Sequence, residues 1–282
     1  MTSRDERSAG HVSRFDRDTA CEPLGDGRYG CRIDRGWWIE RGPNGGYVAA
    51  TMLTSFIAEV ADPMRAPRSL TVHYLAPPAE GPAEIVVSID RQGRSLTYAS
   101  ARMYQGERLL VAAMCAFAAS APGVTFNDSQ MPAVPVAGDL VDLVRPDGAP
   151  MVPMSERYQM RWAIGALPWE GSADRAVAGG WIRPVEARPL DHRLLAALCD
   201  AWVPPVFSRV EERLGVPTID LTIHFLAPLP HPGMSDTDFV LSVFSSTVAG
   251  DGFIEEDGEI WSADGVLLAK CRQLALQLPL PG

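Results

Sequence analysis

The sequence LTVHYLAP at residues 70–77 occurs a second time as LTIHFLAP at residues 221–228. Six of the eight residues are identical, and the two exchanges are valine to isoleucine and tyrosine to phenylalanine. Each copy is rich in β-branched and aromatic residues and ends with proline, which is typical of a strand that leaves its sheet. The copies start 151 residues apart in a chain of 282. One recurrence at half the chain length indicates a duplicated domain rather than a short-period repeat.

The flanking sequence repeats in the same order. A helix-like segment precedes each copy, and three strand-like segments separated by glycine-containing turns follow it. The helix-like segments are 46–60 and 190–203; the strand-like segments are 81–91, 95–105 and 108–118, then 238–248, 253–263 and 266–278. The predicted unit is a strand, a helix and four antiparallel strands, present twice. An alignment of residues 110–112 on 267–269 gives an offset of 157 for the last strand.

Composition narrows the functional classes. With 46% hydrophobic residues, a net charge of −10 and a pI near 5.0, the chain is expected to be globular and not to bind nucleic acid or anionic membranes non-specifically. There is no run of 18 apolar residues and no apolar stretch near the N-terminus, so we expect neither a membrane span nor a secretion signal. Five scattered cysteines without CxxC spacing favour a reduced, cytoplasmic protein.

The predicted domain organisation has four parts. Residues 1–14 are polar and are expected to form a flexible tail, and residues 15–119 form the first repeat. Residues 120–155 are rich in proline and glycine and lack periodicity, which indicates a linker. Residues 156–282 form the second repeat.

The first helix begins in the sequence RGPNGGY at residues 41–47. Asn44 is a candidate N-cap, and Gly45 and Gly46 allow another backbone to approach the helix start closely. Free N–H groups there, from Gly46 and Tyr47, are candidates to bind a developing oxyanion or a ligand. The alternative is a tight helix–sheet contact without a chemical role. The sequence is not a Walker loop, because GK[ST] is absent.

A duplication acts as an internal control, since a polar residue in only one half can mark retained chemistry. Asp200 is predicted within the second helix, where small apolar neighbours make a carboxylate costly unless it is paired or hydrated. The alternative is an exposed acid near the end of that helix. The first helix has no acid at the comparable place.

Two further polar residues distinguish the second half. In the last strand, period-2 alternation places Gln273 on the same face as residues 267, 269, 271 and 275. Its amide is therefore expected to face the interior and to need partners. The 157 offset predicts Ala116 as its counterpart. Thr218 corresponds to Pro67 by the 151 offset, but strict alternation turns it away from the core, so only a bulge or the strand entry can re-aim it. Structural roles for both residues remain open from the pattern alone.

The histidines and common nucleophile motifs offer less. His73 and His224 occupy the same position in both copies, which favours a structural role. The remaining histidines show no metal-ligand spacing, and GxSxG is absent, so neither a metal site nor a serine-hydrolase elbow is predicted.

With these features together, the chain resembles acyl-CoA thioesterases of the thioesterase II group, over about residues 15–280. The resemblance implies an α+β double-hotdog fold, in which each unit is a long helix wrapped by an antiparallel sheet. It implies that Asp200, Thr218 and Gln273 hold a water that hydrolyses the thioester without a covalent intermediate, and that no cofactor or metal takes part. Gly45, Gly46 and Tyr47 match its oxyanion and substrate-binding segment. We also expect a role in fatty acid metabolism and, because of an exposed sheet edge, a homo-oligomer, either a dimer or a tetramer.

Departures and alternatives remain. Tyr47 stands where close members have glutamine, and Arg68 where they have histidine, which bears on substrate range and efficiency rather than reaction type. Arg68, Arg91 and Arg94 are candidates for the coenzyme A phosphates. One alternative is a hotdog hydratase or dehydratase, but that chemistry uses an Asp/His pair with several residues between, whereas Asp191 and His192 are adjacent and Asp191 is a candidate N-cap. A second alternative is an acyl-CoA-binding protein without activity.

Overall fold

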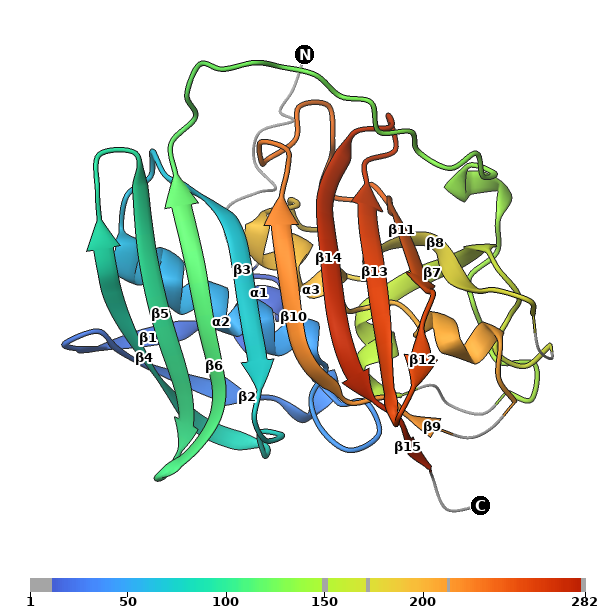
Figure 1. The fold of residues 1–282 in the computed structure, drawn as a ribbon, viewed down its shortest axis with the longest axis horizontal. Helices are drawn as coiled ribbons and strands as arrows, with labels where there is room; N and C mark the ends of the chain where they lie inside the picture. The colour runs from blue at the N-terminus through green and yellow to red at the C-terminus, as the bar shows by residue number, and fades with distance from the viewer. Residues whose placement is uncertain (1–11, 149–151, 171–172, 212–213, 280–282) are drawn as a thin grey trace, which may run out of the picture.

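The computed structural model describes residues 12–148, 152–170, 173–211 and 214–279. Within these residues, thirteen strands form one sheet in the order β1-β2-β4-β5-β6-β3-β10-β14-β13-β11-β8-β7, with β12 paired to β13. Figure 1 shows the broad curved sheet in front and helices α2 and α3 behind it. No helix in the described part of the chain is long and apolar enough to span a membrane.

The first half opens with α1 and β1, which the sequence did not predict, and continues from β2 with the expected elements. In chain order these are α1 (Arg14–Asp18), β1 (Cys21–Gly25), β2 (Arg28–Ile33), η1 (Arg35–Trp37), α2 (Gly45–Val60), β3 (Ala66–Tyr74), β4 (Gly81–Gln92), β5 (Leu96–Gln105) and β6 (Arg108–Ala118). The side chain of Asn44 caps α2 by accepting a hydrogen bond from Tyr47 N, as predicted. Most residues of α2 are buried because the sheet curves around it.

The second half repeats this order after the linker. The linker contains η2 (Ala137–Asp139) and the start of η3 (Pro153–Arg157). The elements of the second half are β7 (Tyr158–Ile164), β8 (Ala176–Pro184), α3 (His192–Leu198), η4 (Pro205–Ser208), β9 (Leu214–Gly215), β10 (Thr218–Phe225), β11 (Val240–Ser246), β12 (Ala249–Gly250), β13 (Phe253–Trp261), β14 (Leu267–Leu276) and β15 (Leu278–Pro279). A small sheet of β15 and β9 completes it. The linker crosses the top of the molecule in Figure 1. Its later part packs on the second half, where Trp181 Nε1 donates to the carbonyl of Pro135 at 2.8 Å.

The two copies of the repeated octapeptide pair with each other. They lie in β3 and β10, neighbouring antiparallel strands at the centre of the sheet. Thr71 is opposite Thr222, and their hydroxyls are 3.2 Å apart. From this pair outward, the order β3-β6-β5-β4-β2 in one half matches β10-β14-β13-β11-β8 in the other. This arrangement is the predicted double hotdog.

The second helix is shorter than predicted. α3 has only seven residues and ends at Leu198, so Asp200 follows the helix instead of lying within it. The backbone tightens there, because Asp200 N donates to Ala197 O at 3.3 Å, three residues back. The description of a long helix in each unit therefore holds only for the first half. Of the predicted 1–14 tail, residues 1–11 lie outside the described residues, and Arg14 already belongs to α1.

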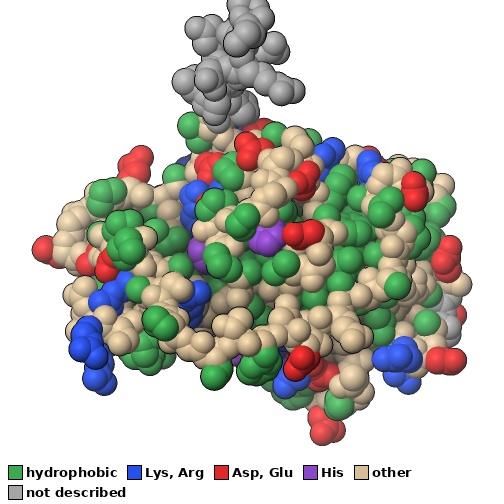
Figure 2. Space-filling view, turned by 90° about the horizontal axis from the view of Figure 1, so that it is seen from above, with side chains coloured by type: hydrophobic (Ala, Val, Ile, Leu, Met, Phe, Trp, Pro, Cys, Tyr) green, Lys and Arg blue, Asp and Glu red, His purple; other side chains and the backbone are tan. Residues whose placement is uncertain are grey.

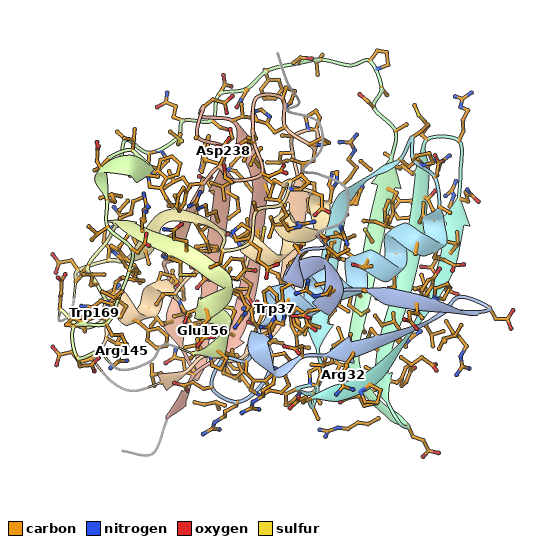
Figure 3. The ribbon with its side chains drawn as sticks, turned by 180° about the vertical axis from the view of Figure 1, so that it is seen from behind. Arg32, Trp37, Arg145, Glu156, Trp169 and Asp238 are labelled. Carbon is orange, nitrogen blue, oxygen red and sulfur yellow. The ribbon has the colours of Figure 1, made fainter. Side chains whose placement is uncertain are left out.

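An aromatic cluster joins the halves on the helix side of the sheet. Trp37, labelled near the middle of Figure 3, stacks on Tyr47 with ring centroids 5.0 Å apart. Phe15 from α1 and Tyr158 from β7 contact Trp37 edge-on. Since these residues come from both halves, the cluster fixes how α2 lies against the second half.

Candidate active site

The start of α2 meets the end of α3, and two glycines make this contact possible. A Cβ atom at Gly46 would overlap the carbonyl oxygen of Ala197, and one at Gly45 would lie 2.9 Å from a carboxylate oxygen of Asp200. Tyr74, the last residue of β3, donates its hydroxyl to the carbonyl of Gly45 at 2.7 Å. The predicted close approach is therefore real, but the main partner is the other helix rather than the sheet.

Asp200 is held by the N-terminal end of α2. Its Oδ2 accepts from Gly46 N at 2.9 Å and from Asn44 Nδ2 at 3.0 Å. Asn44 Nδ2 also donates to the backbone carbonyl of Asp200 at 2.7 Å, so one side chain caps α2 and anchors the acid. This second role of Asn44 was not predicted, because the two residues are 156 positions apart. The N-terminal end of a helix also favours a negative charge.

Thr218 and Gln273 lie on neighbouring strands and are joined directly. Thr218 Oγ1 donates to Gln273 Oε1 at 2.9 Å. The register of β10 on β14 shifts between Thr218 and Asp220, which is the irregularity needed to re-aim the threonine. Gln273 is 7% exposed and faces inward with Cys271 and Ala275, as alternation predicted. Its amide also lies close enough to the carboxylate of Asp200 to lower the pKa of that acid. The three residues therefore form one connected group.

A fourth polar residue, Glu256, belongs to the same group and was missed. It is the cross-strand partner of Gln273 and accepts from Gln273 Nε2 at 2.6 Å. The sequence could have indicated this residue, because period-2 alternation places Glu256 on the inward face of β13 with Ile254, Gly258 and Ile260.

Both acids have raised pKa values. Burial raises the pKa of Asp200 to about 6, although hydrogen bonds from Gly46, Gln273, Gly45 and Asn44 act in the opposite direction. Burial likewise raises the pKa of Glu256 to about 8, with further upward contributions from the charges of Asp200 and Glu255. At neutral pH the pair therefore carries close to one negative charge, on Asp200. An acid with a pKa near the working pH is suited to general-base catalysis.

The structure does not support the predicted oxyanion role for the start of α2. The N–H of Gly46 is bound to Asp200, and the N–H of Tyr47 is bound to the Asn44 side chain at 3.0 Å. The side chain of Tyr47 is fully buried and donates to the carbonyl of Asp18 at 2.8 Å, so it belongs to the core rather than to a substrate surface. The physical reason is that these donors are already used to cap the helix and to hold the acid.

The three candidate phosphate-binding arginines are not brought to this site. Arg65, just before β3, donates to the backbone carbonyls of Gly93 and Arg94, which places Arg94 and the end of β4, where Arg91 lies, at the start of β3. The acid and Tyr74 lie at the other end of that strand. Arg68 lies near His192, whose pKa is lowered by burial and by the Arg68 charge. On the face seen from above, basic and acidic side chains are interspersed (Figure 2).

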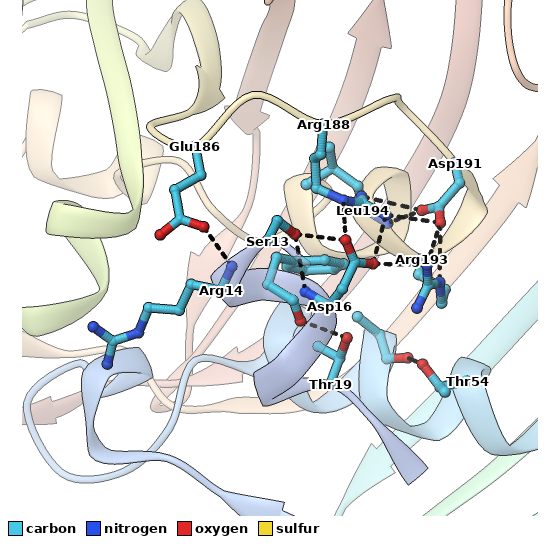
Figure 4. Close-up of polar contacts among 12 residues, drawn as sticks. Ser13, Arg14, Asp16, Thr19, Thr54, Glu186, Arg188, Asp191, Arg193 and Leu194 are labelled. Atoms are coloured by element: carbon cyan, nitrogen blue, oxygen red, sulfur yellow. Dashed lines mark hydrogen bonds and ion pairs between the residues drawn. The ribbon is translucent and has the colours of Figure 1, made fainter. Parts of the chain in front are cut away.

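The adjacent Asp191 and His192 do not form a catalytic pair. Asp191 caps α3 by accepting from Leu194 N at 2.8 Å. It also pairs with Arg188 at 2.9 Å and with Arg193 at 2.8 Å, in the network drawn in Figure 4. Because the arginines and the cap occupy the carboxylate, this geometry does not support hydratase chemistry.

Two hotdog units fused into one sheet, with an Asp–Gln–Thr group at the meeting point of their helices, define a thioesterase-type double-hotdog protein. The comparisons with known proteins agree. Residues 34–119 match the acyl-CoA thioesterase N-terminal domain, and residues 128–277 match the acyl-CoA thioesterase C-terminal domain. The chain belongs to this acyl-CoA thioesterase family.

Its relatives cover the whole length. A hotdog-fold protein of unknown function from Alicyclobacillus acidocaldarius is 30% identical with a TM-score of 0.85, over 96% of this chain and all of that one. A putative thioesterase II from Thermobifida fusca is 26% identical with a TM-score of 0.82, over 94% and 98% of the two chains. An uncharacterized Mycobacterium tuberculosis protein is 26% identical over 93% of this chain and 97% of its own.

Proposed function

We propose that this protein hydrolyses acyl-CoA thioesters to free acid and coenzyme A, with Asp200, Thr218 and Gln273 holding the attacking water. Membership in the thioesterase family supports the reaction type. The observation that carries the site is the group itself: Thr218 is hydrogen-bonded to Gln273, and the Gln273 amide lies close enough to the Asp200 carboxylate to lower its pKa, although the residues are up to 73 positions apart in the chain.

The hydrogen-bond directions suggest how the water is held. The hydroxyl proton of Thr218 is donated to Gln273 Oε1, so the Thr218 oxygen can only accept a hydrogen bond from the water. Asn44 and Gly46 both bind Oδ2 of Asp200, so we assign the water to Oδ1. A water that donates one proton to Thr218 Oγ1 and the other to Asp200 Oδ1, with Gln273 fixing the threonine, presents a lone pair for attack.

The reaction then balances without a covalent intermediate. The water oxygen bonds to the thioester carbon while Asp200 takes one of its protons. The carbon–sulfur bond breaks as the carbonyl re-forms, and the thiolate of coenzyme A receives the proton. General-base help of this kind contributes about 10²–10⁴-fold.

A thiol-release screen over short, medium, long and aromatic acyl-CoAs tests the proposal. We expect release of coenzyme A from at least one class at a rate well above spontaneous hydrolysis. Thermal stabilisation by an acyl-CoA without thiol release would contradict hydrolysis and favour the non-catalytic acyl-CoA-binding alternative. A dimer or tetramer stays a prediction that sedimentation can check, and the roles of Arg68, Arg91 and Arg94 stay predictions as well.

A further inference from the structure

The orientation of the Gln273 amide decides what Thr218 can do. With Oε1 toward Thr218, the threonine must donate to the glutamine, and its oxygen is left to accept from a water. If the amide were turned over, the NH₂ group would face Thr218 and occupy that oxygen. The site as proposed therefore needs Gln273 in one of its two orientations.

Two acceptors lie on the Nε2 side of this amide. Glu256 Oε1 is 2.6 Å from Nε2, and the carboxylate of Asp200 also interacts with the amide. Turning the amide over would point its carbonyl oxygen at the ionised Asp200, and the bond from Nε2 to Glu256 would be replaced by one in which Glu256 must donate its carboxylic proton. The charge of Asp200 thus opposes the turned-over orientation, and Glu256, the direct cross-strand neighbour, holds Nε2 in the observed one.

We propose that Glu256 is a positioning residue of the hydrolytic site, which fixes the Gln273 side chain with Oε1 toward Thr218. This inference rests on the proposed acyl-CoA hydrolysis. Glu256 acts through Gln273 and is not assigned a contact with substrate.

The first half of the molecule shows that the fold itself does not need this acid. Glu256 pairs with Gln273 on β13 and β14, and the matching pair on β5 and β6 is Ala99 with Cys115. Ala99 is completely buried, and Glu256 is 7% exposed. An inward carboxyl group in a packed sheet is unfavourable unless it is hydrogen-bonded. Its presence only beside the polar group is explained by the bond to Gln273.

The ionisable groups around Glu256 predict how the site responds to pH. They are Asp200 after α3, Cys271 on β14 and Glu255 on its own strand, and none of these is basic. With its pKa raised to about 8, mainly by burial, Glu256 is mostly neutral at pH 7. Above pH 8 a second negative charge appears beside Asp200 and opposes the charge that develops on the attacked thioester. The rate should rise as Asp200 ionises near pH 6 and fall above about pH 8.

Kinetics of Glu256→Gln and Glu256→Ala test the inference, with the best substrate of the screen and spontaneous hydrolysis subtracted. Glutamine keeps the acceptor and cannot ionise, so we expect kcat at pH 7 to be retained and the decline above pH 8 to vanish. Alanine removes the acceptor, and we expect kcat to fall about tenfold with little change in KM. The matched control is Asp257→Asn, which removes the neighbouring carboxylate paired with Arg272 on the opposite face. It should keep the wild-type rate and both limbs of the pH profile.

The outcomes separate this inference from the function on which it rests. If the wild-type protein releases no thiol from any acyl-CoA, both are overturned. If the wild type is active but Glu256→Gln keeps the alkaline decline, or folded Glu256→Ala keeps the wild-type kcat, only the positioning role is overturned. Circular dichroism shows whether each variant is folded, and Glu256→Gln alone decides the question if the alanine variant is not.

Discussion

The two halves share a fold but treat four equivalent positions in opposite ways. Strand register and the distance from each helix N-cap align Leu53 with Asp200, Pro67 with Thr218, Ala99 with Glu256, and Cys115 with Gln273. In the first half all four positions are buried and help to form the core. In the second half they gather into one polar group, in which Gln273 bonds to Thr218 and Glu256 and lies beside Asp200. The fold therefore forms with apolar residues at these positions, so folding does not explain why the second half has polar ones.

The helices differ in the same sense. α2 runs for 16 residues and stays buried past Leu53, whereas α3 stops two residues before Asp200. Counted from the N-caps, Gly46 of α2 corresponds to Arg193 of α3, which pairs with Asp16. Glycines at the start of a helix are needed only in α2, where Asp200 and the end of α3 approach it.

Removing the acid should have the largest effect on activity. Asp200→Asn keeps the shape of the side chain but cannot accept a proton, and its new NH₂ group competes with the donors at Gly46 and Asn44. We expect kcat for acyl-CoA hydrolysis to fall by at least about two orders of magnitude. An assay of thiol release from the acyl-CoA measures kcat, with Asp257→Asn as a charge-matched control. A wild-type rate in a folded Asp200→Asn protein would remove the acid from the mechanism.

Adding a side chain at Gly46, at the start of α2, should mainly reduce stability. A Cβ at position 46 would overlap the backbone of Ala197, which cannot move aside as a side-chain end could. We expect Gly46→Ala to lower the free energy of unfolding by about 2–3 kcal/mol, measured by urea denaturation. Gly123→Ala is the matched control, because nothing lies within 4 Å of its added Cβ. Equal stability of the two variants would mean that the α2–α3 contact is looser than described.

The fold could be predicted because the sequence pattern of one unit occurs twice in the chain. The repeated octapeptide located both central strands, and alternation then placed Gln273 inward. The alignment of the last strands was one residue off, however. Leu221 pairs with Gln273 and Leu70 pairs with Cys115, so the counterpart of Gln273 is Cys115 and not Ala116. A one-residue error of this kind exchanges the two faces of a strand.

The site was less predictable, for physical reasons. The end of α3 depends on Asn44 and Gly46, which come from the other half, so local helix propensity could not reveal that Asp200 lies beyond the helix. The same tertiary contacts use the amides that the motif had suggested for an oxyanion. Glu256 could have been found, since its strand alternates clearly, but neither the resemblance nor the charge pattern drew attention to it.

The stability of the protein should respond to pH through Glu256. Its pKa rises from 4.5 to about 8 on folding, so the folded state binds the proton more tightly than the unfolded state. The wild type therefore loses stability as the pH rises through this range, whereas Glu256→Gln does not. We expect the variant to gain at least about 1 kcal/mol relative to the wild type between pH 5 and pH 8. Urea denaturation at both pH values measures this, and parallel pH dependences would mean that Glu256 is not buried as described.

The smallest effect concerns the bond between Thr218 and Gln273. We expect Thr218→Val and Gln273→Ala each to lower kcat about tenfold. Because both variants break the same 2.9 Å bond, the double variant should lose less than the product, with a coupling of about 1 kcal/mol. Thr222→Val is the matched control, since this threonine also bonds across strands, to Thr71, but on the opposite face of β10. Strict additivity, or an equal loss in Thr222→Val, would mean that the second half does not use the pair that distinguishes it from the first.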